Sequence, residues 1–203
     1  MVDSGRPSRL WYVLEWVLGA IGLLCVAWYG AVTFRADQYQ RAESAKLNRV
    51  VEQHPAERPT IQRPRSASTK TPDHAMIGRL EIPRVNMSVM VVNGDDEATL
   101  KVAAGHLPDT PLPWELGNSA VAGHRDSFFR PLSKVKLHDS LILTTPHGEF
   151  HYAVSSLRIV EPNDLSVLAQ NGRSALTLVT CYPFAYIGRA PKRFIVRADH
   201  VPS

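Results

Sequence analysis

Cysteine is scarce in this chain, and its scarcity excludes a disulfide framework. The 203 residues include two cysteines, Cys25 and Cys181. Cys25 falls inside a long apolar segment that is typical of a membrane span, so we expect no disulfide between it and Cys181. A lone thiol outside the membrane is a liability unless it is buried or used in chemistry. Taken alone, Cys181 fits a packed core cysteine and a reactive cysteine equally well.

The chain also lacks a basic patch interleaved with aromatic residues, which argues against nucleic acid as a partner. The formal net charge is +4 and the isoelectric point is 9.2, but most of the excess falls in residues 35–74. We expect these charges to face anionic lipid or cell-wall polymer. His147 and His151 are too far apart in an extended strand to chelate, so we expect no metal site, and no cofactor is expected either.

One long apolar run is present, residues 10–34, in which Glu15 is the charged residue. About 20 apolar residues cross a hydrocarbon core, so this run predicts one N-terminal transmembrane helix, an uncleaved signal anchor after a cytoplasmic segment 1–9. Residues 35–74 predict a polar linker: a solvent-exposed helical extension to residue 54, then a flexible tether rich in Pro, Arg, Ser and Thr. Positive charges on both sides of the span leave its orientation undecided.

Residues 75–203 have the pattern of one mainly β domain. Short runs rich in Val, Ile, Leu, Phe and Thr are separated by turn residues, and Pro146-His147-Gly148 is typical of a hairpin tip. Brief helices are expected at 95–104, 128–133 and 162–169. The pattern predicts an eight-stranded closed or nearly closed β-barrel with short helices. The expected strands are 76–82, 86–92, 119–123, 140–144, 149–154, 157–160, 175–180 and 192–198.

The segment around Cys181 carries the strongest chemical signal. An apolar run ends in Thr180 and Cys181, a turn follows, and Arg193 opens the next apolar run twelve residues after the cysteine. Two strands joined in this way can place a thiol beside a guanidinium, a pair that suits thiolate attack on a carbonyl. Arg189 and Arg197 are the rivals of Arg193 for this role.

His124 is the candidate acid or base among the eight histidines. The apolar run before it, 120–123, delivers it to a strand end, and Arg125-Asp126 then turn the chain. Active-site groups tend to lie where strands of a rigid scaffold give way to loops. A capping or surface histidine is the alternative interpretation.

Three segments taken together resemble the sortase family of cysteine transpeptidases. Thr177-Leu178-Val179-Thr180-Cys181 is similar to the family's TLxTC signature, and Gly123-His124-Arg125-Asp126 resembles its catalytic-histidine segment. Arg193 followed by Phe-Ile-Val resembles the strand that carries its essential arginine. The resemblance covers residues 75–199 and is greatest to class D sortases, and it implies a sortase-like β-barrel.

The resemblance also implies a role for each of four residues. Cys181 would be the nucleophile that attacks the Thr carbonyl of an LPxTG-like sorting signal and forms a thioacyl enzyme. His124 would protonate the departing amine and deprotonate the incoming one. Arg193 would hydrogen-bond the peptide or the developing oxyanion. Thr180 would help to shape the substrate-binding pocket.

The partners implied are secreted proteins with a C-terminal LPxTG-like sorting signal, an amine acceptor, and membrane lipid. The acceptor would be a peptidoglycan precursor or a pilin lysine, and the enzyme would be a single-pass protein of the cell membrane with its catalytic domain outside the cytoplasm. Two alternatives stay open. One is a cysteine hydrolase with the same residues, and the other is a non-enzymatic envelope-binding module in which Cys181 is packing.

Overall fold

The computed structural model describes residues 9–53, 61–62, 71–186 and 188–202. Its contacts divide the chain into two units, Met1–Gln38 and Tyr39–Ser203. The expected cytoplasmic segment lies outside the described residues except for Arg9, and so does most of the expected tether, at residues 54–60 and 63–70.

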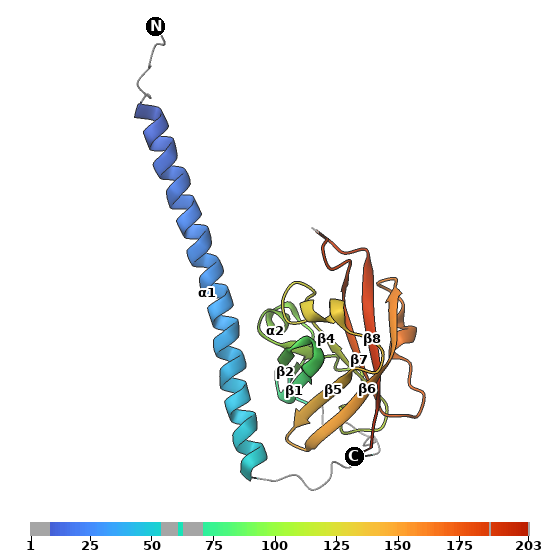
Figure 1. The fold of residues 1–203 in the computed structure, drawn as a ribbon. Coiled ribbons are helices and arrows are strands. Elements are labelled where there is room, and N and C mark those ends of the chain that lie inside the picture. The colour runs from blue at the N-terminus through green and yellow to red at the C-terminus, as the bar shows by residue number, and fades with distance from the viewer. Residues whose placement is uncertain (1–8, 54–60, 63–70, 187, 203) are drawn as a thin grey trace. The chain divides into compact units, whose positions relative to one another are not determined.

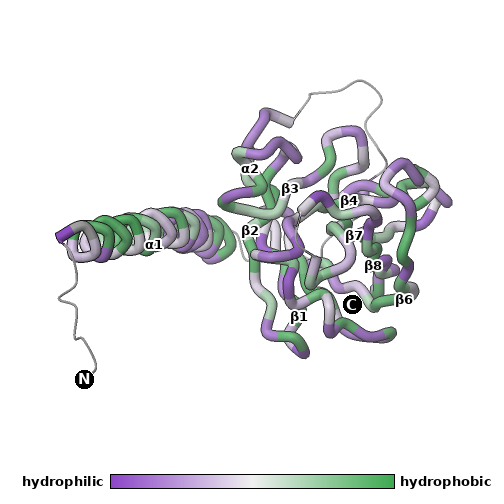
Figure 2. Tube along the Cα trace, turned by 90° about the horizontal axis from the view of Figure 1, so that it is seen from above, coloured by the Kyte–Doolittle hydropathy of each residue, from purple (hydrophilic) through white to green (hydrophobic). Residues whose placement is uncertain are grey.

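The first helix, α1, is continuous over the 45 residues Arg9–Gln53 (Figure 1). Among the described residues it is the one helix long and apolar enough to cross a membrane. Figure 2 shows the apolar residues as green stretches along it. The expected transmembrane helix and its helical extension are therefore one helix, and no break separates them because no Pro occurs between residues 9 and 53.

The end of α1 belongs to the same unit as the β domain. The Gln40 side chain accepts from the backbone amide of Met90 at 2.7 Å and donates to the Val102 carbonyl at 2.6 Å. Leu47 is fully buried. The expectation of a wholly solvent-exposed extension is therefore wrong at Leu47, because an apolar side chain of the helix gains from being removed from water.

The β domain is a closed barrel of eight strands in the order β1-β2-β3-β4-β7-β8-β6-β5 (Figure 1). The pairs β2–β3 and β4–β7 are parallel and the other neighbouring pairs are antiparallel. β1 and β5, the first and last strands in this order, also pair with each other, so the sheet closes and neither of them is a free edge. This closure confirms the predicted barrel. The strands are β1 (Met76–Ile82), β2 (Met87–Asn93), β3 (Ala104–His106), β4 (Asn118–Ala122), β5 (Ser140–Thr145), β6 (Gly148–Val160), β7 (Ala175–Tyr182) and β8 (Lys192–His200).

The expected set of strands differs from the observed set in two places. The expected strands 149–154 and 157–160 are a single strand, β6, whose register against β8 shifts between Val154 and Ser156. Such a shift leaves a residue unpaired without ending the strand. The polar serines at this point therefore led to the wrong prediction of a turn between two strands. The sequence does not predict β3, because three residues cannot display an alternating pattern.

Short helices connect the strands; three lie close to the expected positions, and the turn at Pro83–Val85 is not among the expected helices. They are α2 (Glu97–Val102) and the 3-10 turns η1 (Pro83–Val85), η2 (Arg130–Lys134) and η3 (Leu165–Leu168). Asp96 caps α2 by accepting from the amides of Ala98 and Thr99. Such a cap satisfies amides that have no partner within the helix. The cap therefore fixes the first residue of α2, the helix that precedes β3 in the chain.

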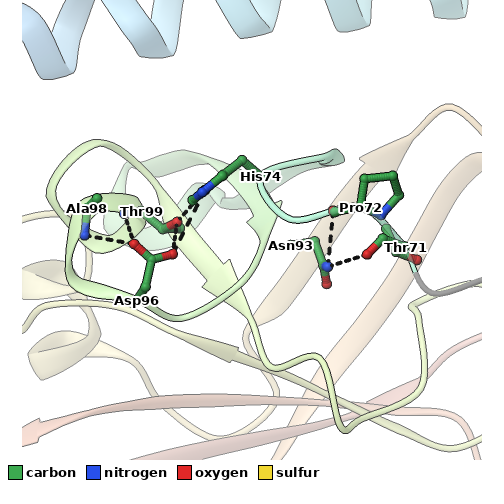
Figure 3. A network of polar contacts seen from close by, with 7 residues as sticks. All are labelled: Thr71, Pro72, His74, Asn93, Asp96, Ala98 and Thr99. Atoms are coloured by element: carbon green, nitrogen blue, oxygen red, sulfur yellow. Dashed lines mark hydrogen bonds and ion pairs between the residues drawn. The ribbon is translucent and has the colours of Figure 1, made fainter.

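A polar network ties the start of the β domain to α2 and β2 (Figure 3). His74 Nδ1 lies 2.9 Å from Thr99 Oγ1, and that hydroxyl donates to Asp96 at 2.6 Å. The side-chain nitrogen of Asn93, Nδ2, donates to the backbone carbonyls of Thr71 and Pro72 at 3.0 and 3.2 Å. These bonds hold the incoming chain against β2 before β1 begins.

The side-chain oxygen of Asn93 leads from this network to a buried histidine on β3. His106 is 1% exposed, its Nδ1 lies 3.1 Å from Asn93 Oδ1, and its Nε2 lies 3.1 Å from the Pro111 carbonyl. Burial lowers the pKa of His106 from its usual 6.5, although the Pro111 carbonyl and Glu115 oppose the shift. The neutral imidazole is therefore a structural element of the fold.

We expect this histidine to make the barrel sensitive to mild acid. Its folded-state pKa lies below the unfolded value, so the unfolded chain binds the proton more readily. The stability that it contributes is complete above about pH 6.5 and is lost as the pH falls below that value. Thermal melts of the full-length protein between pH 7.5 and 5 should show this loss, and His106→Gln should remove most of it.

His200 provides the comparison for that experiment. Burial and the nearby His151 lower its pKa as well, but its side chain is less buried than that of His106. His200→Gln should therefore remove the smaller share of the acid-induced fall in melting temperature. An undiminished fall in His106→Gln would contradict the role given to His106.

Candidate active site

Cys181 lies on β7 and Arg193 on β8, and His124 follows the end of β4; these three strands are neighbours in the barrel. β7 pairs with β4 on one side and with β8 on the other (Figure 1). Cys181 on β7 is the register partner of Arg193 on β8. Directly opposite residues of an antiparallel pair point to the same face with Cβ atoms about 5 Å apart. The backbone therefore places Cys181, near the end of β7, beside Arg193, near the start of β8.

His124 joins this pair from the other side. The parallel register of β4 and β7 runs to Ala122 opposite Val179, and the Gly123 amide then donates to the Val179 carbonyl at 3.1 Å. β4 ends at Ala122, and His124 is the second residue of the segment that follows it. The parallel pairing of β4 with β7 therefore brings His124 to the end of β7 that carries Cys181.

These three residues form a candidate row, His124–Cys181–Arg193, and its strand members Cys181 and Arg193 lie on the face of the sheet opposite the main core. Leu178 and Phe194, on the other face, pack in or against the main hydrophobic cluster. Val179 and Ile195 instead belong to a second apolar cluster outside the barrel. This second cluster also contains Val160, Val167 and Leu168, from the end of β6 and from η3. Cys181 and Arg193 therefore lie next to this second apolar cluster on the outer face of the sheet.

Thr180 and Gly123 hold the segment after β4 close to the end of β7. Thr180 is 2% exposed, and its hydroxyl donates to the Gly123 carbonyl at 2.7 Å. A Cβ on Gly123 would lie 2.7 Å from Cγ of Phe129, so this position has no room for a side chain. The amides of Ser127 and Phe129 donate to the His124 carbonyl at 3.4 and 3.1 Å. The backbone of His124 is thus held by the core beneath it and by the turn that follows.

The structure separates Arg193 from its two rivals. Arg193 is half-buried, and its Nη1 donates to the carbonyls of Lys192 at 3.1 Å and Ala190 at 3.5 Å. Arg197 pairs with Thr177, about 13 Å along the strand from the level of Cys181, and its Nε lies 3.7 Å from Asp199. Arg189 is exposed in the loop. Register alone therefore favours Arg193 as the neighbour of the thiol.

Glu97 lies near His124, and the sequence does not single it out. Lys101 lowers the pKa of Glu97 through a 2.7 Å hydrogen bond and its charge, and His124 adds to the lowering. The first turn of α2 therefore faces the same end of the barrel as the row. The sequence does predict a helix with an acidic first turn here, which could have drawn attention to Glu97. It does not reveal which end of the barrel that turn faces.

Three aromatic rings cover the opposite face beside the thiol. Tyr182, Phe184 and Phe194 have ring centroids 5.4 to 6.4 Å apart. Phe184 and Phe194 pack against the main core cluster. Contacts of this kind stabilise beyond the area that they bury. They anchor the end of β7 and leave Cys181, a free and half-exposed cysteine, on the accessible side.

A thiol, an imidazole and a guanidinium in one row can carry out acyl transfer. The thiolate is the reactive form of cysteine, and cationic neighbours favour it. An imidazole supplies and removes protons, and a guanidinium offers donors to an oxyanion. The fold and the row together define a β-barrel enzyme of the cysteine-dependent acyl-transfer class.

Comparison with known proteins identifies the family. The sortase domain model matches residues 80–201, and the chain belongs to the sortase family of cysteine transpeptidases. Sortase D of Bacillus subtilis (strain 168) is 33% identical over 184 residues, which cover 88% of this chain and 93% of that protein. This likeness agrees with the class D resemblance of the sequence.

Solved structures agree on the fold. A Clostridium perfringens sortase D5 transpeptidase has a TM-score of 0.58 at 27% identity, over 64% of this chain and 81% of that chain. Sortase A from Corynebacterium diphtheriae has a TM-score of 0.59 at 25% identity, over 82% and 84% of the two chains. The predicted barrel and the predicted transpeptidase are confirmed, whereas the roles of His124, Cys181, Arg193 and Thr180 stay predictions.

Proposed function

We propose that this transpeptidase cleaves an LPxTG-like sorting signal at the C-terminus of secreted proteins and transfers the acyl group to an amine of the cell envelope or of a pilin. The observation that carries the proposal is the row of three side chains. Cys181 and Arg193 are register partners on β7 and β8, and His124 follows the adjacent end of β4. Membership of the sortase family supports the substrate class.

In the first half-reaction the Cys181 thiolate adds to the threonine carbonyl of the signal. The developing oxyanion accepts hydrogen bonds from the guanidinium of Arg193, the register partner of Cys181. His124 gives its proton to the nitrogen of the scissile bond. The C–N bond then breaks, an amine leaves with the C-terminal part of the signal, and a thioester to Cys181 remains.

In the second half-reaction an incoming amine attacks the thioester carbonyl. His124, now neutral, accepts the proton that the amine loses, and the thiolate of Cys181 is the leaving group. The new amide bond joins the secreted protein to its acceptor, and the enzyme regains its starting protonation. Thr180 acts in this scheme by holding Gly123, because its hydroxyl is bound to that carbonyl and its side chain is buried.

We place the barrel outside the cytoplasm, with α1 as the single membrane anchor. The helix supplies a span of sufficient length and apolarity. Secreted substrates that are held in the same membrane by their own hydrophobic tails would meet the enzyme at a raised effective concentration. A membrane-impermeant thiol reagent on intact cells tests the orientation, because it should label Cys181 without lysis.

The reaction is tested with the full-length protein in detergent, a set of LPxTG-variant peptides, and either triglycine or a lysine peptide. Mass spectrometry should find the peptide up to its threonine joined to the added amine. Formation of the water adduct alone, at a rate independent of added amine, would instead establish the hydrolase. Unchanged peptides would contradict the proposed LPxTG-like substrate.

A further inference from the structure

The loop between β7 and β8 connects Cys181 to Arg193. The side chain of Arg125, the residue next to His124, holds this loop in place. Arg125 follows His124 directly. Its Nη1 donates to the Pro183 carbonyl at 3.0 Å. Its Nη2 donates to the carbonyls of Tyr186 at 2.7 Å and Gly188 at 3.0 Å. One side chain thus binds three backbone carbonyls of a single loop.

The aromatic ring of Tyr186 adds a fourth contact. Cζ of Arg125 lies 5.8 Å from the centroid of that ring, within the range of a cation–π interaction. The guanidinium is planar and presents five donors in a fixed fork, so it can serve several carbonyls at once. A lysine ammonium is a compact point charge on a flexible stem and cannot reproduce this arrangement.

The position of these contacts matters for the chemistry. The first bound carbonyl comes two residues after Cys181, and the last comes five residues before Arg193. Arg125 therefore joins the turn after β4 to the segment that leaves the thiol and returns to the guanidinium. Because both Nη atoms are engaged by carbonyls of the protein, the side chain is placed to hold the loop rather than to contact a substrate.

We infer that Arg125 is a positioning residue for transpeptidation, which fixes His124 relative to Cys181 and Arg193 by holding the β7–β8 loop. The inference rests on the proposed roles of those three residues. A displacement of about 1 Å between reacting groups can cost roughly 10²-fold in rate. A side chain that sets this separation therefore affects kcat without touching the substrate.

The test compares Arg125→Ala, Arg125→Lys and Arg130→Ala in the full-length protein in detergent. Arg130 is an exposed arginine five residues further on, in η2, and is the matched control. We expect Arg125→Ala to lower kcat for peptide transfer by roughly 10²-fold, with a smaller change in KM. Arg125→Lys should stay at least about tenfold below wild type, because it keeps the charge but not the fork. Arg130→Ala should match wild type.

A second measurement separates positioning from general stability. The rate of Cys181 alkylation by iodoacetamide, followed against pH, reports the surroundings of the thiol. We expect Arg125→Ala and Arg125→Lys to change this pH profile, whereas Arg130→Ala should leave it unchanged. If Arg125→Ala unfolds, Arg125→Lys carries the test, because it retains the length and charge of the side chain.

Two results would overturn the inference: wild-type kcat in a folded Arg125→Ala, or full restoration by Arg125→Lys. A parallel Cys181→Ala sample separates this failure from failure of the proposed function. If Cys181→Ala is inactive while the Arg125 variants are normal, only the positioning role is lost. If Cys181→Ala remains active, the catalytic row itself is wrong.

Discussion

Cys181→Ala is expected to abolish transpeptidation, with kcat reduced by at least about 10³-fold, the scale on which loss of a nucleophile acts in enzymes of this mechanism. The reason is chemical, because the thioester requires a sulfur at the end of β7. Initial rates of peptide transfer, followed by chromatography, measure the effect. The melting temperature should change little, since Cys181 is only half-buried.

The chain offers its own control for this substitution. Cys25 is the other cysteine, exposed on α1 and outside the β domain. Cys25→Ala should transfer peptide at the wild-type rate. A Cys181→Ala protein that still transfers peptide would show that Cys181 is not the nucleophile.

Arg193→Ala is expected to lower kcat by about 10² to 10³-fold, the usual cost of removing one oxyanion donor. The donor acts on charge that develops in the transition state, so KM should change much less than kcat. Arg193→Lys should recover part of the rate, because an ammonium retains the charge but not the planar geometry. Steady-state kinetics with a sorting-signal peptide and triglycine give both parameters.

The two rival arginines define the controls for Arg193. Arg189→Ala removes an exposed loop side chain, and Arg197→Ala removes one that is paired with Thr177, four residues before the thiol. Both variants should keep kcat within a few-fold of wild type. A loss of 10²-fold in either of them, with Arg193→Ala unaffected, would transfer the role to the rival.

Much of the barrel could be predicted from the sequence, because its strands are short apolar runs between clear turn residues. β1 has the expected bounds, and the turn at Pro146 separates β5 from β6 as expected. The failures have local causes. β3 is too short to show a period, and the register shift at Ser156 makes one strand look like two.

The sequence predicts the candidate members of the site and the pairing of Cys181 with Arg193, but it does not predict the place of His124 beside them. Local motifs single out His124, Cys181 and Arg193, each at the end or start of an apolar run. Their arrangement in one row depends on the parallel pairing of β4 with β7, strands whose paired residues lie 57 positions apart, as in Asn118 with Ala175. No periodicity within either segment encodes that pairing.

Arg125 shows a further limit of sequence reasoning. The sequence presents it as part of a turn, beside Asp126. Its partners are backbone carbonyls 58 to 63 residues away, and a carbonyl is common to every residue type. Contacts of this kind leave no pattern in side-chain chemistry, so only the folded chain reveals them.

The most direct test of the account is the mass of the enzyme during turnover without an acceptor amine. Full-length protein mixed with an LPxTG-like peptide should gain the mass of the peptide up to its threonine, and digestion should place this adduct on Cys181. Hydroxylamine should release it, as expected for a thioester. An adduct on another residue, or product formation through Cys181→Ala, would contradict the central claim.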